Sequence, residues 1–338
     1  MSAPDLLPAC AELHCLSNYS FLRGASHPEE LVERAAGQRY AALALTDECS
    51  LAGAVRAHMA AKDAGLPLIL GSEFTLTDRT KLVLLAQDRA SYGDLSQLIT
   101  RGRRNSAKGS YRLTRDDVAD LASSCLALWL PAVDPRTPTI DPALEMTSCW
   151  LRDVFADRAW IGVGLFAQAG DDARLARFEA LSRASGLPLV AAGDVHMHVR
   201  ARRALQDTLT AIRLRMQVVA CGHALHPNGE RHLRSRARLA GIYPPTLLAE
   251  TLTIARRCHF SLDELRYEYP QEIVPAGETA SSWLRKLVET GLASRYPKDW
   301  DRVNWCQSCN PRRDFLAGYY SSDPNYYGSD PNFPADPN

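Results

Sequence analysis

Histidines and carboxylates recur in this sequence directly after short apolar segments, although they lie far apart along the chain. Imidazole nitrogens and carboxylate oxygens together are typical ligands of Zn, Mn and Fe, and mixed sets of them hold the paired ions of many phosphoesterases. The residue types therefore indicate a metal-dependent hydrolytic centre, provided that the fold brings them together. The candidates are His14, Asp47, Glu48, Glu73, Asp194, His196 and His198.

The elements that must position these side chains are short runs rich in Leu, Val and Ile. The runs are continuous rather than alternating, which is typical of parallel strands buried on both faces. The predicted strands are 41–45, 66–70, 82–86, 125–130, 160–165 and 187–191, with a further short strand that ends near His14.

Helical segments separate most of these strands. Pro28 and the two glutamates after it suit the first turn of a helix that ends at Gly37. Ser50 is the predicted N-cap of a second helix, which Gly65 stops, and Asp171 begins another. Repeated βα units predict a parallel sheet, either closed as a barrel or open and doubly wound. Chemistry gathers at the carboxyl ends of such strands, so we expect the candidate ligands to meet at one mouth.

The pattern changes after His198. Helical segments follow one another from 200 to about 255, and an extended connection leads to a short helix over 281–290. The near-repeats YYSSDPN, YYGSDPN and FPADPN then close the sequence, and a proline in each copy predicts a disordered tail. The predicted domains are a barrel over 8–200, a helical extension over 201–275, the start of another domain over 276–302 and a divergent tail over 303–338.

Charge and cysteine usage restrict the setting of the protein. Lys plus Arg and Asp plus Glu both number 39, so the net charge indicates no particular partner. One local cluster could contact phosphates, although a solvated helix face gives the same pattern. Nine irregularly spaced cysteines and no long apolar segment predict reduced thiols, a cytoplasmic location and no membrane contact. The possible phosphate contacts are Arg101, Arg103, Arg104 and Lys108.

Three motifs occur in the order typical of the PHP (polymerase and histidinol phosphatase) family. ELHCLSNYS resembles its opening D-L-H-x-H-S motif. ALTDECSLAGAVRAHMAAKDAGLPLILGSEF is similar to its second block, with a T-D-H turn and a G-x-E, and AAGDVHMH resembles its closing D-x-H. The resemblance implies an α/β fold, a distorted seven-stranded β/α barrel followed by a helical connection.

Longer segments resemble one branch of this family, the error-prone bacterial C-family DNA polymerases. They include SFLRGASHPEELVERAA, RGRRNSAKGSYRLTRDD and VPAGET, and the similarity runs from about residue 11 to residue 297. The resemblance implies damage-induced translesion synthesis by a nucleotidyltransferase that uses Mg. It also implies contact with DNA and with mutasome or clamp proteins, and it makes residues 276–302 the start of a palm domain.

Three positions depart from the PHP metal-binding pattern. Leu16 stands in place of the second histidine of the opening motif, and Glu48 in place of the histidine of the T-D-H turn. Lys81 stands where many PHP domains have another histidine. A multi-metal site is therefore dismantled, and two alternatives stay open. One divalent ion, Zn or Mn, could remain, or Lys81 could replace the metal by pairing with the carboxylates. The retained ligand candidates are His14, Glu73, Asp194 and His196.

Three functions are compatible with these features. The first is the N-terminal PHP portion of an error-prone polymerase, inactive in DNA synthesis in this form because the palm aspartates do not occur in it. The second is a stand-alone PHP-type metal-dependent phosphoesterase. The third is a non-catalytic scaffold or interaction module. We assign no catalytic residue.

Overall fold

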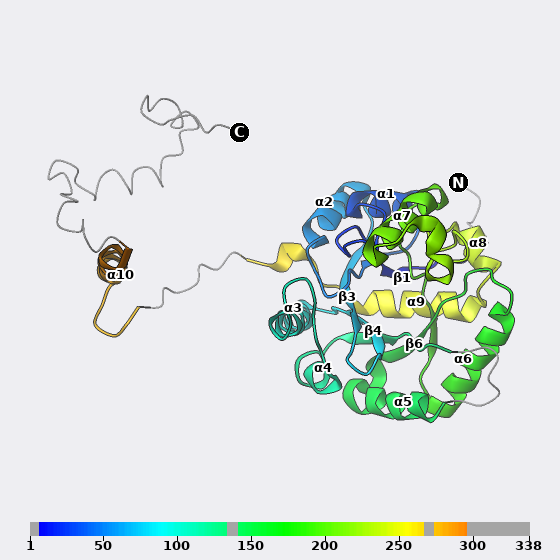
Figure 1. Cartoon of the computed structure of the whole chain (residues 1–338). Helices are drawn as coiled ribbons and strands as arrows, with labels where there is room; N and C mark the ends of the chain where they lie inside the picture. Colours follow the sequence, from blue (N-terminus) through cyan, green and yellow to red (C-terminus); the bar gives the residue numbers. More distant parts are fainter. Residues whose placement is uncertain (1–6, 134–140, 267–273, 296–338) are drawn as a thin grey trace. The chain divides into compact units, whose positions relative to one another are not determined.

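The computed structural model describes residues 7–133, 141–266 and 274–295. The chain divides into two compact units, one up to Arg266 and one from Tyr267 onward, and each is described by itself (Figure 1). The second unit contributes one described helix, α10 (Ala280–Arg295), which agrees with the short helix predicted over 281–290. The predicted tail over 303–338 lies outside the described residues.

The first unit is built on one seven-stranded sheet whose strands follow one another in sequence order. The predicted strands are confirmed within about two residues, including the short strand near His14, except that the strand predicted over 66–70 continues to Thr75 and so contains Glu73. The strands are β1 (Glu12–Cys15), β2 (Leu43–Leu45), β3 (Leu68–Thr75), β4 (Lys81–Leu85), β5 (Leu126–Trp129), β6 (Ala159–Val163) and β7 (Leu189–Ala191).

The sheet is not wholly parallel, and this corrects the prediction from the apolar runs. β4 is antiparallel to both β3 and β5, whereas the other neighbouring pairs are parallel. Only residues 76–80 join β3 to β4. A parallel crossover needs about a dozen residues or more, so this connection can form only a hairpin.

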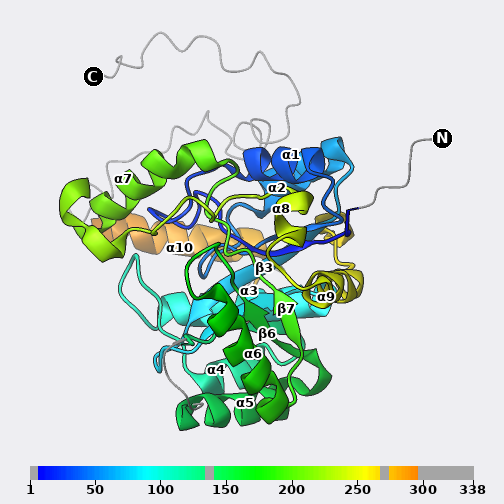
Figure 2. The same ribbon diagram turned by 90° about the vertical axis from the view of Figure 1, so that its right-hand side faces the viewer.

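The two edges of the sheet meet and close it into a distorted barrel. Cys15 of β1 forms a parallel bridge with Val195, just beyond β7. The amide of Leu16 donates to the carbonyl of Val195 at 2.8 Å, and the amide of Val195 donates to the carbonyl of His14 at 2.9 Å. The barrel expected from the motif resemblance is therefore present (Figure 2).

Helices cover the outside of this barrel in sequence order. They are α1 (Pro28–Gly37), α2 (Ala54–Ala64), α3 (Arg89–Arg104), α4 (Arg115–Leu121), α5 (Pro142–Phe155) and α6 (Asp171–Ser185). Leu31, Leu95 and Phe155 are among the helical side chains that pack in the outer core. A second buried cluster, with Val83 and Leu128, occupies the other face of the sheet and includes Ile254 from a later helix.

Helix ends agree with the sequence signals in most cases. Pro28 occupies the first turn of α1, and Gly65 ends α2 with a left-handed φ of 64°. Ser50, however, does not cap α2, because the helix begins three residues later than expected, after Gly53. The Ser50 amide instead donates a hydrogen bond to the Ser72 hydroxyl at 3.1 Å, which ties this turn to β3.

The described part of the predicted helical extension contains three α-helices, but they do not follow one another directly, because residues 215–235 form a long connection with only two short 3-10 turns. The three helices are α7 (Arg203–Leu214), α8 (Arg236–Ala240) and α9 (Pro245–Arg257), of which α9 lies against β7 and β1. In the part of the chain that the structure describes, no helix is both long enough and apolar enough to cross a membrane.

Candidate functional site

A cluster of charged side chains lies where the carboxyl ends of β1 and β3 meet the start of β4. Because β3 and β4 form a hairpin, Glu73 and Lys81 come from neighbouring strands; Glu73 pairs with Val83 and Thr75 with Lys81. The closure of the barrel brings His14 and Asp194 to the same place. We call the side chains described in the next two paragraphs the mouth cluster.

Glu73 is the centre of the mouth cluster, and its side chain is fully buried. Its Oε2 lies 2.6 Å from His14 Nε2 and 2.9 Å from Lys81 Nζ. Its Oε1 accepts a hydrogen bond from Arg23 Nη1 at 2.6 Å. Both oxygens of this carboxylate are therefore engaged by nitrogen groups of the protein.

Two further ion pairs complete the mouth cluster. Arg23 Nη1 also lies 2.6 Å from Oε2 of Glu48. The other carboxylate oxygen of Glu48, Oε1, accepts a hydrogen bond from the Tyr111 hydroxyl at 3.0 Å. Asp194 is paired with Arg231 through Oδ2, and its Oδ1 lies 3.0 Å from His196 Nε2. Three carboxylates thus face three cationic side chains. The carboxylates are those of Glu48, Glu73 and Asp194, and the cations are Arg23, Lys81 and Arg231.

The backbone at Asp194 is held in an unusual conformation. Its φ is 42°, in the left-handed region that side chains other than glycine rarely adopt. The preceding amide, of Gly193, donates to buried Glu12 at 2.9 Å, and a Cβ at Gly193 would collide with that carboxylate. The Glu12 carboxylate also accepts from the His14 amide at 3.0 Å, so one buried acid positions both sides of the mouth.

The pKa directions show how strongly these charges interact. Burial by itself would raise the pKa of Glu73, but the charges of Lys81, His14 and Arg23 outweigh it and hold that pKa well below its ordinary value. Burial lowers the pKa of Lys81, against the opposing influence of Glu73. Burial and the nearby cations lower the pKa of His196 to about 3, so its imidazole is neutral at physiological pH.

Asp47, a candidate metal ligand by sequence, instead holds a loop through hydrogen bonds. Its two carboxylate oxygens accept from the amides and the hydroxyls of Ser17 and Ser20, at 2.7–3.1 Å. These bonds fix the loop after β1, which carries Arg23 into the mouth. Leu16, in place of a histidine, is fully buried beside this loop.

The side chains of the mouth cluster include a possible ligand set for one metal ion. His14, Glu73 and Asp194 each offer one ligand atom, all within 4.8 Å of one another, a spacing that could hold one ion. Lys81 and Arg23 already neutralise Glu73, however, and Arg231 neutralises Asp194. A site for several ions does not fit this arrangement, because three cations stand beside the oxygens that the ions would need.

The remaining candidates form no ion pair with the carboxylates of the mouth cluster among the described residues, although Arg103 also donates to the Glu48 carbonyl at 3.4 Å. His198 Nδ1 lies 2.8 Å from the Ser26 hydroxyl. On α3, Arg101 pairs with Asp120 at 2.6 Å, and Arg103 donates to the carbonyl of Cys49 at 3.0 Å. Arg104 and Lys108 are exposed, and phosphate contact by them stays a prediction.

Sequence reasoning missed two of the three cations in the mouth cluster. Arg23 lies in the loop after β1, and its only signal was a position near the carboxyl end of a predicted strand. Arg231 opens a run of arginines (Arg231, Arg234, Arg236 and Arg238) in which nothing indicates a contact with Asp194. It reaches the mouth because the segment after α7 returns alongside the end of β7, where the His196 amide donates to the Arg231 carbonyl at 3.0 Å.

Comparison with known proteins agrees with this geometry. Residues 12–135 match the family model of the PHP domain. The chain is 58% identical over 296 residues to an error-prone DNA polymerase of Dechloromonas aromatica, covering 86% of this chain and 28% of that protein. It is 58% identical over 289 residues to the error-prone DNA polymerase of Methylococcus capsulatus, covering 85% of this chain and 27% of that protein.

Among solved structures, an amidohydrolase from Chromobacterium violaceum matches with a TM-score of 0.43 and 18% identity, over 56% of this chain and 88% of that one. The polymerase relatives are far longer than this chain, which spans little more than a quarter of their length. The chain therefore carries a PHP domain, and over most of its length it is a relative of the error-prone DNA polymerases.

Proposed function

We propose that this chain is the PHP portion of an error-prone DNA polymerase and that its barrel is a scaffold stabilised by ion pairs. The observation that carries this proposal is the pairing of each mouth carboxylate with a cation of the protein itself. Arg23 and Lys81 lie 2.6 and 2.9 Å from Glu73, and Arg231 pairs with Asp194. The positive charge that metal ions supply in a hydrolytic centre is here supplied by side chains.

One residual ion is the second candidate for this site. The cluster of His14, Glu73 and Asp194 favours it, and Zn or Mn would suit one imidazole and two carboxylates. Such an ion would supply Lewis acidity, but it would compete with Lys81 for the same oxygen of Glu73. We therefore favour the ion-paired state, in which Lys81 takes the place of the metal.

We propose further that this chain is part of a longer polymerase. That polymerase joins nucleotides on primed DNA with Mg during damage-induced synthesis, and it contacts DNA and mutasome or clamp proteins. The barrel over 8–200 and the helical extension over 201–275 support the palm, which begins within 276–302. No residue of this chain is assigned to nucleotide transfer.

A chimaera tests the scaffold function. Residues 11–297 of this chain would replace the matching segment of the Dechloromonas aromatica polymerase, and primer extension would be measured. We expect the chimaera to extend primers, and this chain alone not to do so. A soluble, folded chimaera without primer extension would argue against the proposal.

A phosphatase assay separates the scaffold from a phosphoesterase. The chain would be incubated with p-nitrophenyl phosphate and added Mn or Zn, beside an Asp194→Asn variant. We expect no release of p-nitrophenol above the level of the variant. Metal-dependent release that Asp194→Asn abolishes would instead establish the stand-alone phosphoesterase.

A further inference from the structure

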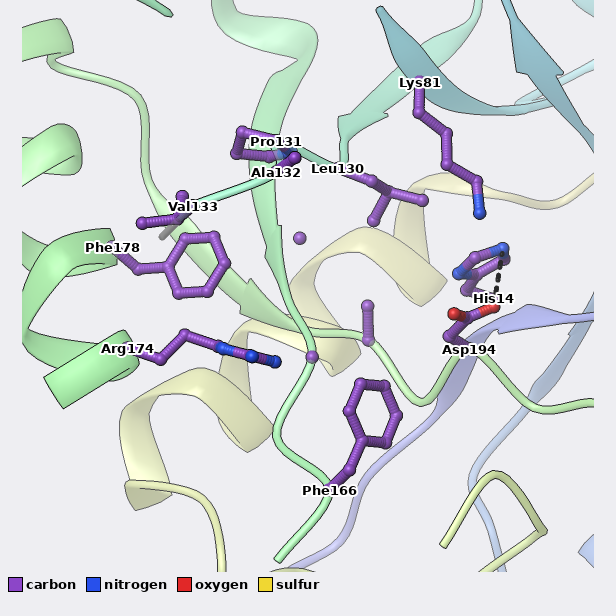
Figure 3. A pocket seen from close by; sticks show the side chains of 13 residues that line it. His14, Lys81, Leu130, Pro131, Ala132, Val133, Phe166, Arg174, Phe178 and Asp194 are labelled. Atoms are coloured by element: carbon purple, nitrogen blue, oxygen red, sulfur yellow. Dashed lines mark ion pairs between the residues drawn. The ribbon is translucent and has the colours of Figure 1, made fainter. Parts of the chain in front are cut away.

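A cavity of about 460 Å³ lies beside the mouth cluster, over the ends of β5 and β6 (Figure 3). This volume is within the range of about 300–1,000 Å³ that is usual for small-molecule sites. At one end lie His14, Lys81 and Asp194 of the mouth cluster. The remaining wall is mostly apolar, and its larger side chains are Leu130, Pro131, Val133, Phe166 and Phe178.

Small residues create the space of this cavity. Gly162 and Gly164 of β6 and its following turn, together with Ala192, line it without filling it. A Cβ at Gly164 would lie 3.0 Å from the ring of Phe166, and one at Gly162 would lie 2.6 Å from Leu130. Glycine at these two positions therefore leaves room for the side chains of Leu130 and Phe166 to lie against the β6 backbone while the cavity stays open.

Among the described residues that line the cavity, Arg174 is the one cation away from the mouth cluster. It lies one helical turn before Phe178 on α6, so both side chains project from the same face of the helix into the cavity (Figure 3). Its Nε is buried and has no hydrogen-bond partner. Within the described residues, no carboxylate forms an ion pair with it.

Further positive charge surrounds the neighbouring aromatic ring. The guanidinium carbons of Arg231 and Arg234 lie 4.1 and 5.9 Å from the centroid of Phe166. Burial lowers the pKa of Arg231 to about 10, and Arg174 is among the charges that contribute to this lowering. On the cavity wall, Lys81 and Asp194 are paired within the mouth cluster, so Arg174 is the lining cation that has no ion pair among the described residues.

We propose that this cavity binds a small organic anion with an apolar body, whose anionic group pairs with Arg174 and whose body packs against Phe166 and Phe178. A buried guanidinium nitrogen without an acceptor is unfavourable, and a carboxylate, sulfonate or phosphate group would satisfy it. The apolar walls would bind the rest of such a molecule, so inorganic phosphate alone is too small and too polar to be the ligand. This site needs neither a metal nor the polymerase activity.

Fluorescence titration with 8-anilinonaphthalene-1-sulfonate, an aromatic anion, tests the proposal on the intact chain. N-phenyl-1-naphthylamine, which lacks the sulfonate, is the neutral probe. Arg174→Gln removes the cation, and Arg183→Gln makes the same change at an exposed position of α6 that does not line the cavity. Ala132→Trp, at an exposed position of the cavity wall, fills the space without removing charge.

We expect saturable binding of one sulfonate probe per chain, weakened at least about ten-fold by Arg174→Gln, which corresponds to about 1.4 kcal/mol. Arg183→Gln should bind like the parent chain, and Ala132→Trp should weaken both probes. The neutral probe should be insensitive to Arg174→Gln. Equal sulfonate binding by the two arginine variants, or no saturable binding by a parent chain with a cooperative melting transition, would overturn the proposal.

Discussion

Two groups of cations on this protein differ in what their charge does. In the mouth cluster, Glu73 is fully buried, and the side chain of its partner Arg23 is 15% exposed. The side chains of Arg101 on α3 and of its partner Asp120 on α4 are 37% and 63% exposed. Both pairs join an arginine to a carboxylate at 2.6 Å, but solvent screens the second pair far more than the first, so the two pairs differ in energy.

The same comparison distinguishes arginines that form contacts within the protein from those that face solvent. Arg103 of α3 is used internally, because it donates to the carbonyl of Cys49 and lies 5.5 Å from the ring centroid of Tyr111. Tyr111 in turn donates to Glu48 of the mouth cluster. A basic sequence cluster therefore contains residues that support the mouth as well as residues that face solvent.

The largest effect is expected from Glu73→Gln. The change would leave Lys81 without its carboxylate and Arg23 with only one, inside a largely buried cluster. Breaking one side of a buried ionic network costs about 3–5 kcal/mol. Urea unfolding should show this loss in the free energy of unfolding; a loss below about 1 kcal/mol would mean that the cluster is solvated like a surface pair.

A smaller effect on the free energy of unfolding is expected when the pH is lowered, through the protonation of His226. Burial, with a smaller contribution from the charge of Arg213, lowers the pKa of His226 to about 4, whereas an unfolded histidine titrates near its ordinary value of 6.5. The unfolded chain therefore takes up this proton first as the pH falls. The associated stability is complete above pH 6.5 and is lost as the pH falls towards 4.

His226→Gln should remove this part of the pH dependence. We expect the decrease in unfolding free energy between pH 7 and pH 4.5 to be about 1–3 kcal/mol smaller in the variant than in the parent chain. Urea unfolding at the two pH values measures it. Parallel decreases in both proteins would show that the pKa of this histidine is not lowered in the folded chain.

The smallest effect is expected from Asp120→Asn on α4, which faces Arg101 of α3. It removes the closer ion-pair partner of Arg101, at 2.6 Å, but both side chains are exposed. The free energy of unfolding should change by about 0–1 kcal/mol. A loss comparable to that of Glu73→Gln in the same urea assay would remove the distinction between the two groups of cations.

The sequence was sufficient to predict the strands because each is a short apolar run, most of them set between helix signals, whereas the choice of a barrel over an open sheet came from the motif resemblance. It did not reveal the reversed direction of β4, since the continuous apolar run KLVLL reads alike in either direction; the shortness of residues 76–80 was the missed signal. Ser50 is a plausible cap by residue type, but its turn is instead tied to Ser72.

The candidate site was partly predictable for a similar reason. His14, Glu73 and Asp194 follow from strand ends, whose positions periodicity and motif order give well. Arg23 and Arg231 lie in irregular segments, and only the serine contacts of Asp47 and the return of the chain after α7 bring them to the mouth. Such long-range placement leaves no local pattern in the sequence.

Metal content combined with chelator-dependent stability tests the central claim most directly. The purified chain would be analysed by inductively coupled plasma mass spectrometry, and its melting temperature measured before and after treatment with EDTA. If Arg23, Lys81 and Arg231 supply the positive charge of the mouth, Zn, Mn and Fe should be far below one ion per chain, and the melting temperature should not change. One tightly held ion per chain, with a marked loss of melting temperature on its removal, would contradict the account.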